Sequence, residues 1–183
     1  MKTTEKIVSL YLRLNGFFLM PHFTTFVGNF KHVDFLGVRL RNSMEKIDEF
    51  VLKVDKGFLA KLNGNSEDIK LWAEVGSKKE IVGSLFPEQK QDYVTKIFGS
   101  ENRIKKVYFD FTLEDERLEQ DTEYLIVPKG RCRNFLLSRF TQMQSEPLRS
   151  KMKKLTKEGS WNWSEEFLGD LLFLRKSGFL KDK

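Results

Sequence analysis

The sequence contains only one cysteine, Cys132, and only two histidines, His22 and His32. A lone cysteine cannot form a disulfide within the chain, which excludes a disulfide-stabilised scaffold and favours a reducing compartment. Two histidines leave almost nothing for a zinc site or for a His-based catalytic triad. Any chemistry that this chain performs is therefore expected to depend on carboxylates.

Several common site motifs are also absent. The sequence has no GxxxxGK[ST] phosphate loop, GxGxxG fingerprint, HExxH zinc motif, CxxC pair or GxSxG elbow. No apolar run approaches the length of a membrane span. The apolar stretch at residues 7–20 is interrupted by Arg13 and Asn15 and lacks a small-residue cleavage pattern, so we expect no signal peptide. These absences predict a soluble, cytoplasmic protein that does not enter a membrane.

The charge of the chain is unevenly distributed. The formal net charge is +6, and residues 129–157 contain nine basic side chains against a single acid, Glu146. Residues 114–123 show the opposite bias, with six acids and one base. A segregated basic segment attracts polyanions such as nucleic acid, although the same pattern is typical of a solvated helix face. The residues expected to bind nucleic acid are Arg131, Arg133, Lys151, Lys153 and Lys154.

Hydrophobic periodicity predicts a mixture of helices and strands. Residues 3–15 have the apolar spacing of a helix that Gly16 ends, whereas residues 43–56 fit either a helix or a strand. The other expected helices are 87–98, 131–143, 147–156 and 164–176. The expected strands are 17–27, 31–40, 69–75, 105–113 and 123–127.

This order predicts an α/β domain of α+β character, in which a mixed central β-sheet is flanked by helices. With 183 residues the chain has the usual length of one domain, and no internal repeat or linker divides residues 1–183. The helix expected at 164–176 is apolar over much of its surface. That surface suits either packing against the core or a contact within a homodimer.

Two acidic residues lie in strands that are otherwise largely apolar. Strand alternation places Asp34 on an apolar face together with Leu36, Val38 and Leu40. It places Glu74 on the same face as Trp72. An acid on an apolar face is costly to bury unless it is paired or bound to a metal. Taken alone, each acid fits an ordinary solvent-facing position better than a catalytic one.

Together, these motifs resemble the PD-(D/E)XK nuclease superfamily. The resemblance rests on four runs, which are LRLNGFF at 12–18, FTTF at 23–26, VDFLGVR at 33–39 and LWAEV at 71–75. The chain is similar to bacterial members of this superfamily in which a helix ends in a Gly-aromatic pair. In those members an Asp-containing strand and a Glu-Val-Lys strand follow the helix. The chain then divides into a nuclease-like core over residues 1–113 and a basic helical part over residues 129–183.

The resemblance implies a restriction-endonuclease-like fold and a site for Mg²⁺ or Mn²⁺ with Asp34 and Glu74 as ligands. The family pattern has a lysine two residues after the glutamate, where this chain has Gly76. Lys78 lies on the same strand face as Glu74 if alternation continues, and is the candidate for the missing lysine. Gly76 could instead mark a β-bulge, or the lysine could be lost. Some families add an acid from the first helix, for which Glu5 is the candidate, although we expect it to point into water.

Two functions from different classes follow. The first is a metal-dependent nuclease in which Asp34, Glu74 and Lys78 hydrolyse phosphodiester bonds, with DNA favoured over RNA. The second is a catalytically inactive protein of the same fold that binds nucleic acid or a protein partner. A small-molecule-binding or structural domain has the least support, because no phosphate loop or cofactor motif is present.

Overall fold

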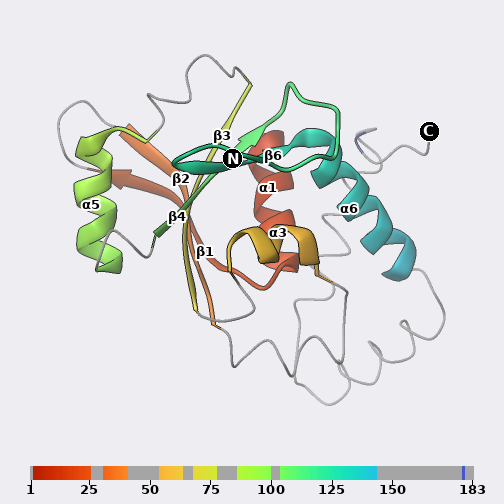
Figure 1. Ribbon diagram of the computed structural model, residues 1–183, viewed down its shortest axis with the longest axis horizontal. Helices are drawn as coiled ribbons and strands as arrows, with labels where there is room; N and C mark the ends of the chain where they lie inside the picture. The colour runs from red at the N-terminus through yellow and green to blue at the C-terminus, as the bar shows by residue number, and fades with distance from the viewer. Residues whose placement is uncertain are drawn as a thin grey trace.

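The computed structural model describes residues 2–25, 31–40, 54–63, 68–77, 86–99, 104–143 and 179. These residues form a mixed six-stranded sheet in the order β1-β2-β3-β4-β6-β5, with helices on both faces (Figure 1). The predicted class, a mixed β-sheet flanked by helices, is confirmed. The helices predicted at 147–156 and 164–176 lie outside the described residues.

The first half of the sheet is an antiparallel meander that follows helix α1 (Thr3–Leu14). Strands β1 (Phe18–Thr25), β2 (Lys31–Arg39) and β3 (Ile69–Gly76) pair in that order. Gly16 follows α1 with a φ of 84°, a left-handed conformation that suits glycine and ends the helix as predicted. The meander therefore begins where the sequence signals indicated.

The second half of the sheet is parallel. Helix α5 (Glu88–Phe98) connects β3 to the parallel strand β4 (Ile104–Asp110), and β6 (Tyr124–Pro128) pairs parallel to β4. Strand β6 continues directly into helix α6 (Lys129–Met143). A parallel connection requires a crossover, and α5 provides it.

One strand boundary and one additional strand differ from the sequence prediction. The strand predicted at 105–113 ends at Asp110, where the Asp110 side chain accepts a hydrogen bond from the backbone N–H of Thr112 and turns the chain. The short strand β5 (Glu119–Gln120) was not predicted, because two residues within an acidic loop show no apolar periodicity. The described part of the ambiguous segment leads into a short helix, α3 (Lys56–Lys61), which the Asp55 side chain caps by accepting from the Phe58 N–H at 3.0 Å.

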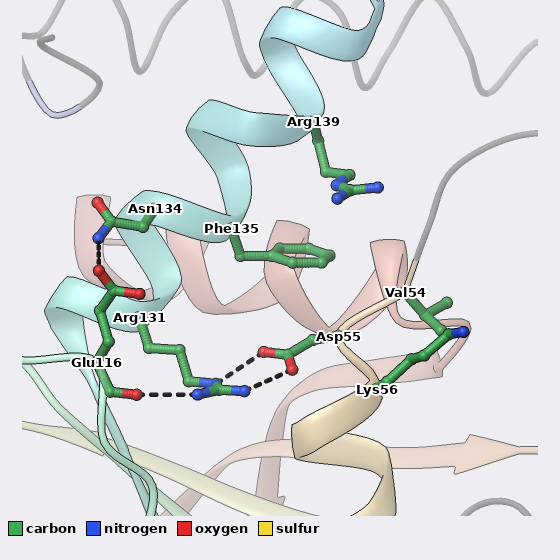
Figure 2. A pocket seen from close by; sticks show the side chains of 8 residues that line it. All are labelled: Val54, Asp55, Lys56, Glu116, Arg131, Asn134, Phe135 and Arg139. Carbon is green, nitrogen blue, oxygen red and sulfur yellow. Dashed lines mark hydrogen bonds and ion pairs between the residues drawn. The ribbon is translucent and has the colours of Figure 1, made fainter.

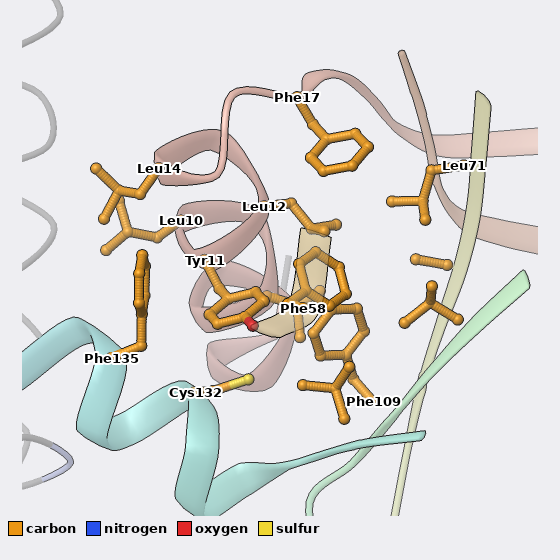
Figure 3. Packing of buried hydrophobic residues seen from close by; sticks show 14 of the residues in the cluster. Leu10, Tyr11, Leu12, Leu14, Phe17, Phe58, Leu71, Phe109, Cys132 and Phe135 are labelled. Atoms are coloured by element: carbon orange, nitrogen blue, oxygen red, sulfur yellow. The ribbon is translucent and has the colours of Figure 1, made fainter. Parts of the chain in front are cut away.

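Two hydrophobic clusters cover the two faces of the sheet. Helices α1, α3 and α6 lie on one face, and α5 lies on the other (Figure 1). On the α1 face, the ring of Tyr11 makes edge-to-face contacts with Phe58, Phe109 and Phe135 at centroid distances of 5.3, 5.7 and 5.0 Å (Figure 3). On the α5 face, Trp72 makes an edge-to-face contact with Phe86 at 5.0 Å. Among the helices that the structure describes, none has the length and apolar character needed to cross a membrane.

Candidate functional site

The structure brings Asp34 and Glu74 together on adjacent strands. The last pair of the β2–β3 ladder is Phe35 with Ala73, and Asp34 and Glu74 are the next residues along the two strands. Beyond that pair, an Asp34 carboxylate oxygen accepts a hydrogen bond from the backbone N–H of Val75 at 2.8 Å. Beyond the last backbone pair of β2 and β3, a side-chain hydrogen bond thus connects the two strands. We refer to Asp34 and Glu74 as the acidic pair.

Glu74 is one of the most buried charged residues in the described part of the chain, with 2% of its surface exposed. Its Oε1 atom accepts hydrogen bonds from the indole N–H of Trp72 at 2.7 Å and from the Lys90 ammonium at 3.2 Å. Burial, together with the negative charge of Asp34, raises the pKa of Glu74 to about 7 in spite of those two donors. A strand that is buried on both faces carries this acid, which rules out the solvent-facing position considered from the sequence.

The surroundings of Asp34 differ from the prediction in one respect. Leu36, on the same face of β2, is buried, but Val38 is half-buried and Leu40 is 43% exposed. Phe35, on the opposite face, is fully buried. The Asp34 face is therefore buried near the acidic pair and becomes exposed toward the end of β2.

The position of the missing family lysine is filled by a tyrosine ring. The β3–β4 register continues without interruption to Gly76 opposite Asp110, so Gly76 does not mark a β-bulge. A Cβ atom at Gly76 would lie 2.5 Å from the hydroxyl oxygen of the fully buried Tyr108. A longer side chain therefore does not fit there unless Tyr108 moves. Lys78, the predicted replacement, lies outside the described residues.

Lys90 is the lysine that reaches the acidic pair in the described part of the chain. It lies in the first turn of α5 and is 8% exposed. We did not predict this role from the sequence, although a signal was present. Lys90 precedes the fully buried Val94 by four residues, so the two share the inward face of the predicted helix.

Asp110 is a third acid on this face of the sheet that the sequence analysis missed. It shares the face of Tyr108 and is fully buried at the end of β4. Its Oδ1 atom accepts hydrogen bonds from the Thr112 N–H and hydroxyl, whereas Oδ2 has no hydrogen-bond partner among the residues that the structure describes. The sequence signal was an acid directly after the apolar run VYF at 107–109.

The donor chemistry of the acidic pair fits a hard divalent cation. Proteins bind Mg²⁺ through one or two carboxylates, with water and substrate phosphate as the other ligands. The charge of Asp34 contributes to the raised pKa of Glu74, and a bound cation relieves that repulsion. Within the described ranges, no group of three or more His, Cys, Asp or Glu side chains is placed to hold a metal ion. Among the described residues, the candidate cation ligands are therefore the two carboxylates of the acidic pair.

The predicted nucleic-acid-binding residues that the structure describes lie away from the acidic pair. Arg131 donates to both carboxylate oxygens of Asp55, at 2.8 and 2.6 Å, and to the carbonyl of Glu116 at 2.9 Å (Figure 2). Arg133 pairs with Glu114 at 3.1 Å. Both arginines belong to α6, which packs on the α1 face, so the sheet separates them from the acidic pair. Lys151, Lys153 and Lys154 lie outside the described residues.

Glu5 has a structural role at the start of α1. Its carboxylate accepts a hydrogen bond from the backbone N–H of Lys2 at 2.7 Å, and 9% of the residue is exposed. The expectation that Glu5 points into water is therefore wrong, because capping the helix draws the side chain back onto its first turn.

Comparisons of the chain with protein-family models, with curated proteins and with solved structures found no match. The geometry of the acidic pair and of Lys90 is therefore the basis for the functional proposal below.

Proposed function

We propose that this chain is a metal-dependent nuclease-like protein with a restriction-endonuclease-like fold that hydrolyses phosphodiester bonds in nucleic acid, DNA in preference to RNA. The observation that carries the proposal is the contact of the Lys90 ammonium with the Glu74 carboxylate, beside Asp34. Two carboxylates and one amine, the groups that the resemblance requires, are thus close together on one face of the sheet.

In this hydrolysis, a water oxygen forms a bond to phosphorus, one bridging P–O bond breaks, and the leaving oxygen takes up a proton. A cation held by Asp34 and Glu74, Mg²⁺ or Mn²⁺, would neutralise phosphate charge and lower the pKa of the attacking water. Lys90 contributes a positive charge that orients the phosphate or the water, the role that the resemblance implies for a lysine at the Gly76 position.

A cleavage assay on supercoiled DNA and on RNA with Mg²⁺ or Mn²⁺ tests this proposal. We expect cleavage that stops in EDTA and is abolished in Asp34→Asn. Cleavage should fall about a hundred-fold or more in Lys90→Gln, because a positioned charge in a catalytic site contributes roughly two to three orders of magnitude. Asn at position 34 keeps an oxygen acceptor for the Val75 N–H, so this variant changes charge with little change in shape. Lys96→Gln, an exposed position on the same helix, is the matched control and should leave cleavage unchanged. If Lys78→Gln reduces cleavage and Lys90→Gln does not, the catalytic lysine is Lys78.

The alternative is a catalytically inactive protein of the same fold that binds nucleic acid or a protein partner. Tyr108 favours it, because its ring fills the space that a lysine at position 76 would need. The raised pKa of Glu74 also favours it, since a carboxyl group with a pKa of about 7 is a weak cation ligand at neutral pH. DNA binding without cleavage under every metal condition would support this alternative. A chain that neither binds nor cleaves DNA or RNA would contradict the nuclease proposal and leave the protein-binding form of the alternative.

Direct metal binding provides a second readout that does not depend on cleavage. Titration with Mn²⁺, followed by electron paramagnetic resonance, should show a bound population in the wild type that Asp34→Asn and Glu74→Gln both remove. Equal binding in all three proteins would place the cation away from the acidic pair.

Nucleic-acid binding itself should weaken steeply with salt, because each phosphate that the protein neutralises releases counterions. The triple variant of Lys151, Lys153 and Lys154 to Gln should reduce the slope of log K against log salt by about 3 if all three contact phosphates. An unchanged slope would indicate that these three lysines belong to an ordinary solvated surface and do not contact phosphates.

A further inference from the structure

A pocket opens on the α1 face of the sheet, between the start of α3 and helix α6, on the opposite side of the sheet from the acidic pair (Figure 2). Its volume is about 520 Å³, which is within the range of small-molecule sites in proteins. Charged side chains from both elements line it, so the identity of a ligand depends on which of these charges are already neutralised.

The two acids that line the pocket are both engaged. Asp55 accepts two hydrogen bonds from Arg131 and one from the Tyr11 hydroxyl at 2.7 Å. The Glu116 carboxylate accepts a hydrogen bond from the side-chain amide of Asn134 (Figure 2). Asp55 and Arg131 therefore cancel each other's charge at the wall of the pocket, whereas Glu116, hydrogen-bonded to a neutral amide, keeps its negative charge.

Two cations of the pocket have no such partner. The guanidinium of Arg139 lies over the ring of Phe135, 5.2 Å from its centroid. Its hydrogen bonds go to the neutral side chains of Ser138 and Gln142, and they occupy three of the five donors that an arginine offers. The exposed Lys56 ammonium makes no hydrogen bond or ion pair in the described part of the chain. Both side chains border the same opening in Figure 2.

The electrostatics of the two arginines agree with this difference. Burial lowers the pKa of Arg139, and the charge of Asp55 only partly opposes that effect. Burial acts in the same direction on Arg131, but the hydrogen bonds and charge of Asp55 outweigh it and raise the pKa of Arg131. The positive charge of Arg139 is thus partly desolvated, and no carboxylate contacts it in the described part of the chain, as in a site that binds an anion.

We propose that this pocket binds a phosphate dianion, in the form of a terminal phosphomonoester, between the guanidinium of Arg139 and the ammonium of Lys56. Stacking on Phe135 holds the guanidinium plane, so its free N–H groups are pre-oriented toward tetrahedral oxygens. Arg139 and Lys56 are the two cations of the pocket that no carboxylate contacts in the described part of the chain, so together they match a doubly charged group better than a carboxylate or a phosphodiester, each of which carries one charge. The charged Glu116 carboxylate lies beyond Arg131 in Figure 2, away from these two cations. The site does not depend on the proposed nuclease activity, because it lies across the sheet from the acidic pair.

Titration with inorganic phosphate at low ionic strength, followed by the amide NMR signals of α3 and α6, tests the proposal. We expect saturable shifts at both helices, and a dissociation constant raised about ten- to a hundred-fold in Arg139→Gln and in Lys56→Gln, since each change removes a charge-assisted hydrogen bond. Arg133→Gln is the matched control, because Arg133 is on the same helix but does not line the pocket. Absence of saturable shifts in the wild type, or an equal loss of affinity in the control, would overturn the proposal.

A second experiment distinguishes a terminal phosphomonoester from the phosphodiesters of a nucleic-acid backbone. A short single-stranded oligonucleotide with a 5′-phosphate should compete with inorganic phosphate for the pocket, whereas the same oligonucleotide with a 5′-hydroxyl should not. Equal competition by both oligonucleotides would mean that the pocket binds backbone phosphodiesters, and it would contradict the assignment to a terminal phosphomonoester.

Discussion

The ammonium of Lys90 lies 3.2 Å from Oε1 of Glu74, and only 9% and 3% of the two side chains are exposed. Transferring two charges from water into the protein interior is costly, and their attraction repays this cost only in part. The pKa of Glu74, raised to about 7, reflects that imbalance, since burial outweighs the stabilising charge of Lys90. The ion pair therefore joins α5 to β3 and places two opposite charges next to Asp34 in the protein interior.

Removal of the Lys90 ammonium should destabilise the protein, because the buried Glu74 carboxylate then loses its neighbouring cation. In Lys90→Ala, the buried carboxylate loses its cation, and we expect the free energy of unfolding at pH 8 to fall by about 3–5 kcal/mol. The fall should be smaller at pH 5, where Glu74 is protonated. Urea unfolding at both pH values measures the difference, and Lys96→Ala on the exposed side of α5 should change stability by less than about 0.5 kcal/mol. Equal effects of the two substitutions would show that the ion pair contributes nothing.

The stability of the wild type should decrease as the pH rises from about 4.5 to about 7. Glu74 has a higher pKa in the folded protein than its ordinary value of 4.5, so the folded state binds the proton more tightly than the unfolded chain. The contribution of the protonated group is complete below pH 4.5 and is lost as the pH rises through 7, a change of roughly 3 kcal/mol. Glu74→Gln should remove this slope from a plot of unfolding free energy against pH. A slope that persists in Glu74→Gln must come from another group.

The contact between Gly76 and Tyr108 predicts a strong coupling between the two positions. Gly76→Ala should reduce the free energy of unfolding by about 1–3 kcal/mol, because the new methyl group meets a fully buried ring. In a Tyr108→Ala background, the same substitution should cost much less. A double-mutant cycle measured by urea unfolding gives the coupling energy, and additive costs would contradict the contact. Only that background offers room for Gly76→Lys, the substitution that restores the family pattern.

Arg131 should contribute to stability far more than Arg133 does. Arg131 makes a two-fold hydrogen-bonded ion pair with Asp55, whose side chain is 8% exposed, whereas Arg133 pairs with the 54% exposed Glu114. We expect Arg131→Gln to cost about 2–4 kcal/mol of unfolding free energy and Arg133→Gln less than about 1 kcal/mol. Thermal unfolding of both variants provides the comparison. If Arg131→Gln instead weakens DNA binding without loss of stability, its role is in the partner interface.

The pH dependence of the Asp55–Arg131 pair has the opposite sign from that of Glu74. Burial raises the pKa of Asp55, but hydrogen bonds from Arg131, the Phe58 N–H and Tyr11 outweigh it and keep the pKa below its ordinary value of 3.8. The stabilisation is therefore present above that value and is lost as the pH falls through the lower pKa of the folded state. Acid unfolding of Arg131→Gln should begin at a higher pH than that of the wild type. An unchanged midpoint would show that the pair does not govern acid stability.

Local patterns in the sequence predicted most of the elements that the structure describes. The apolar spacing of helix α1, the stops at Gly16 and Gly99, and the strands β2 and β3 agree with the prediction within a residue or two. Strand alternation also placed Glu74 on the face of Trp72, away from Ala73, because successive side chains of a strand point to opposite faces whatever the fold. Each of these features depends on residues that are near neighbours in the chain.

Only the tertiary structure decided which charges meet. Lys90 is 16 positions from Glu74, and Arg131 is 76 positions from Asp55. No periodicity relates residues so far apart, since their distance depends on strand order, on the crossover through α5 and on the packing of α6 against α1. The sequence also showed that position 76 holds glycine where the family pattern has lysine. It could not show that the ring of Tyr108, from the neighbouring strand, fills the space of that lysine side chain. The types of charged group were visible in the sequence, and their partners depended on the sheet, which brings distant segments side by side.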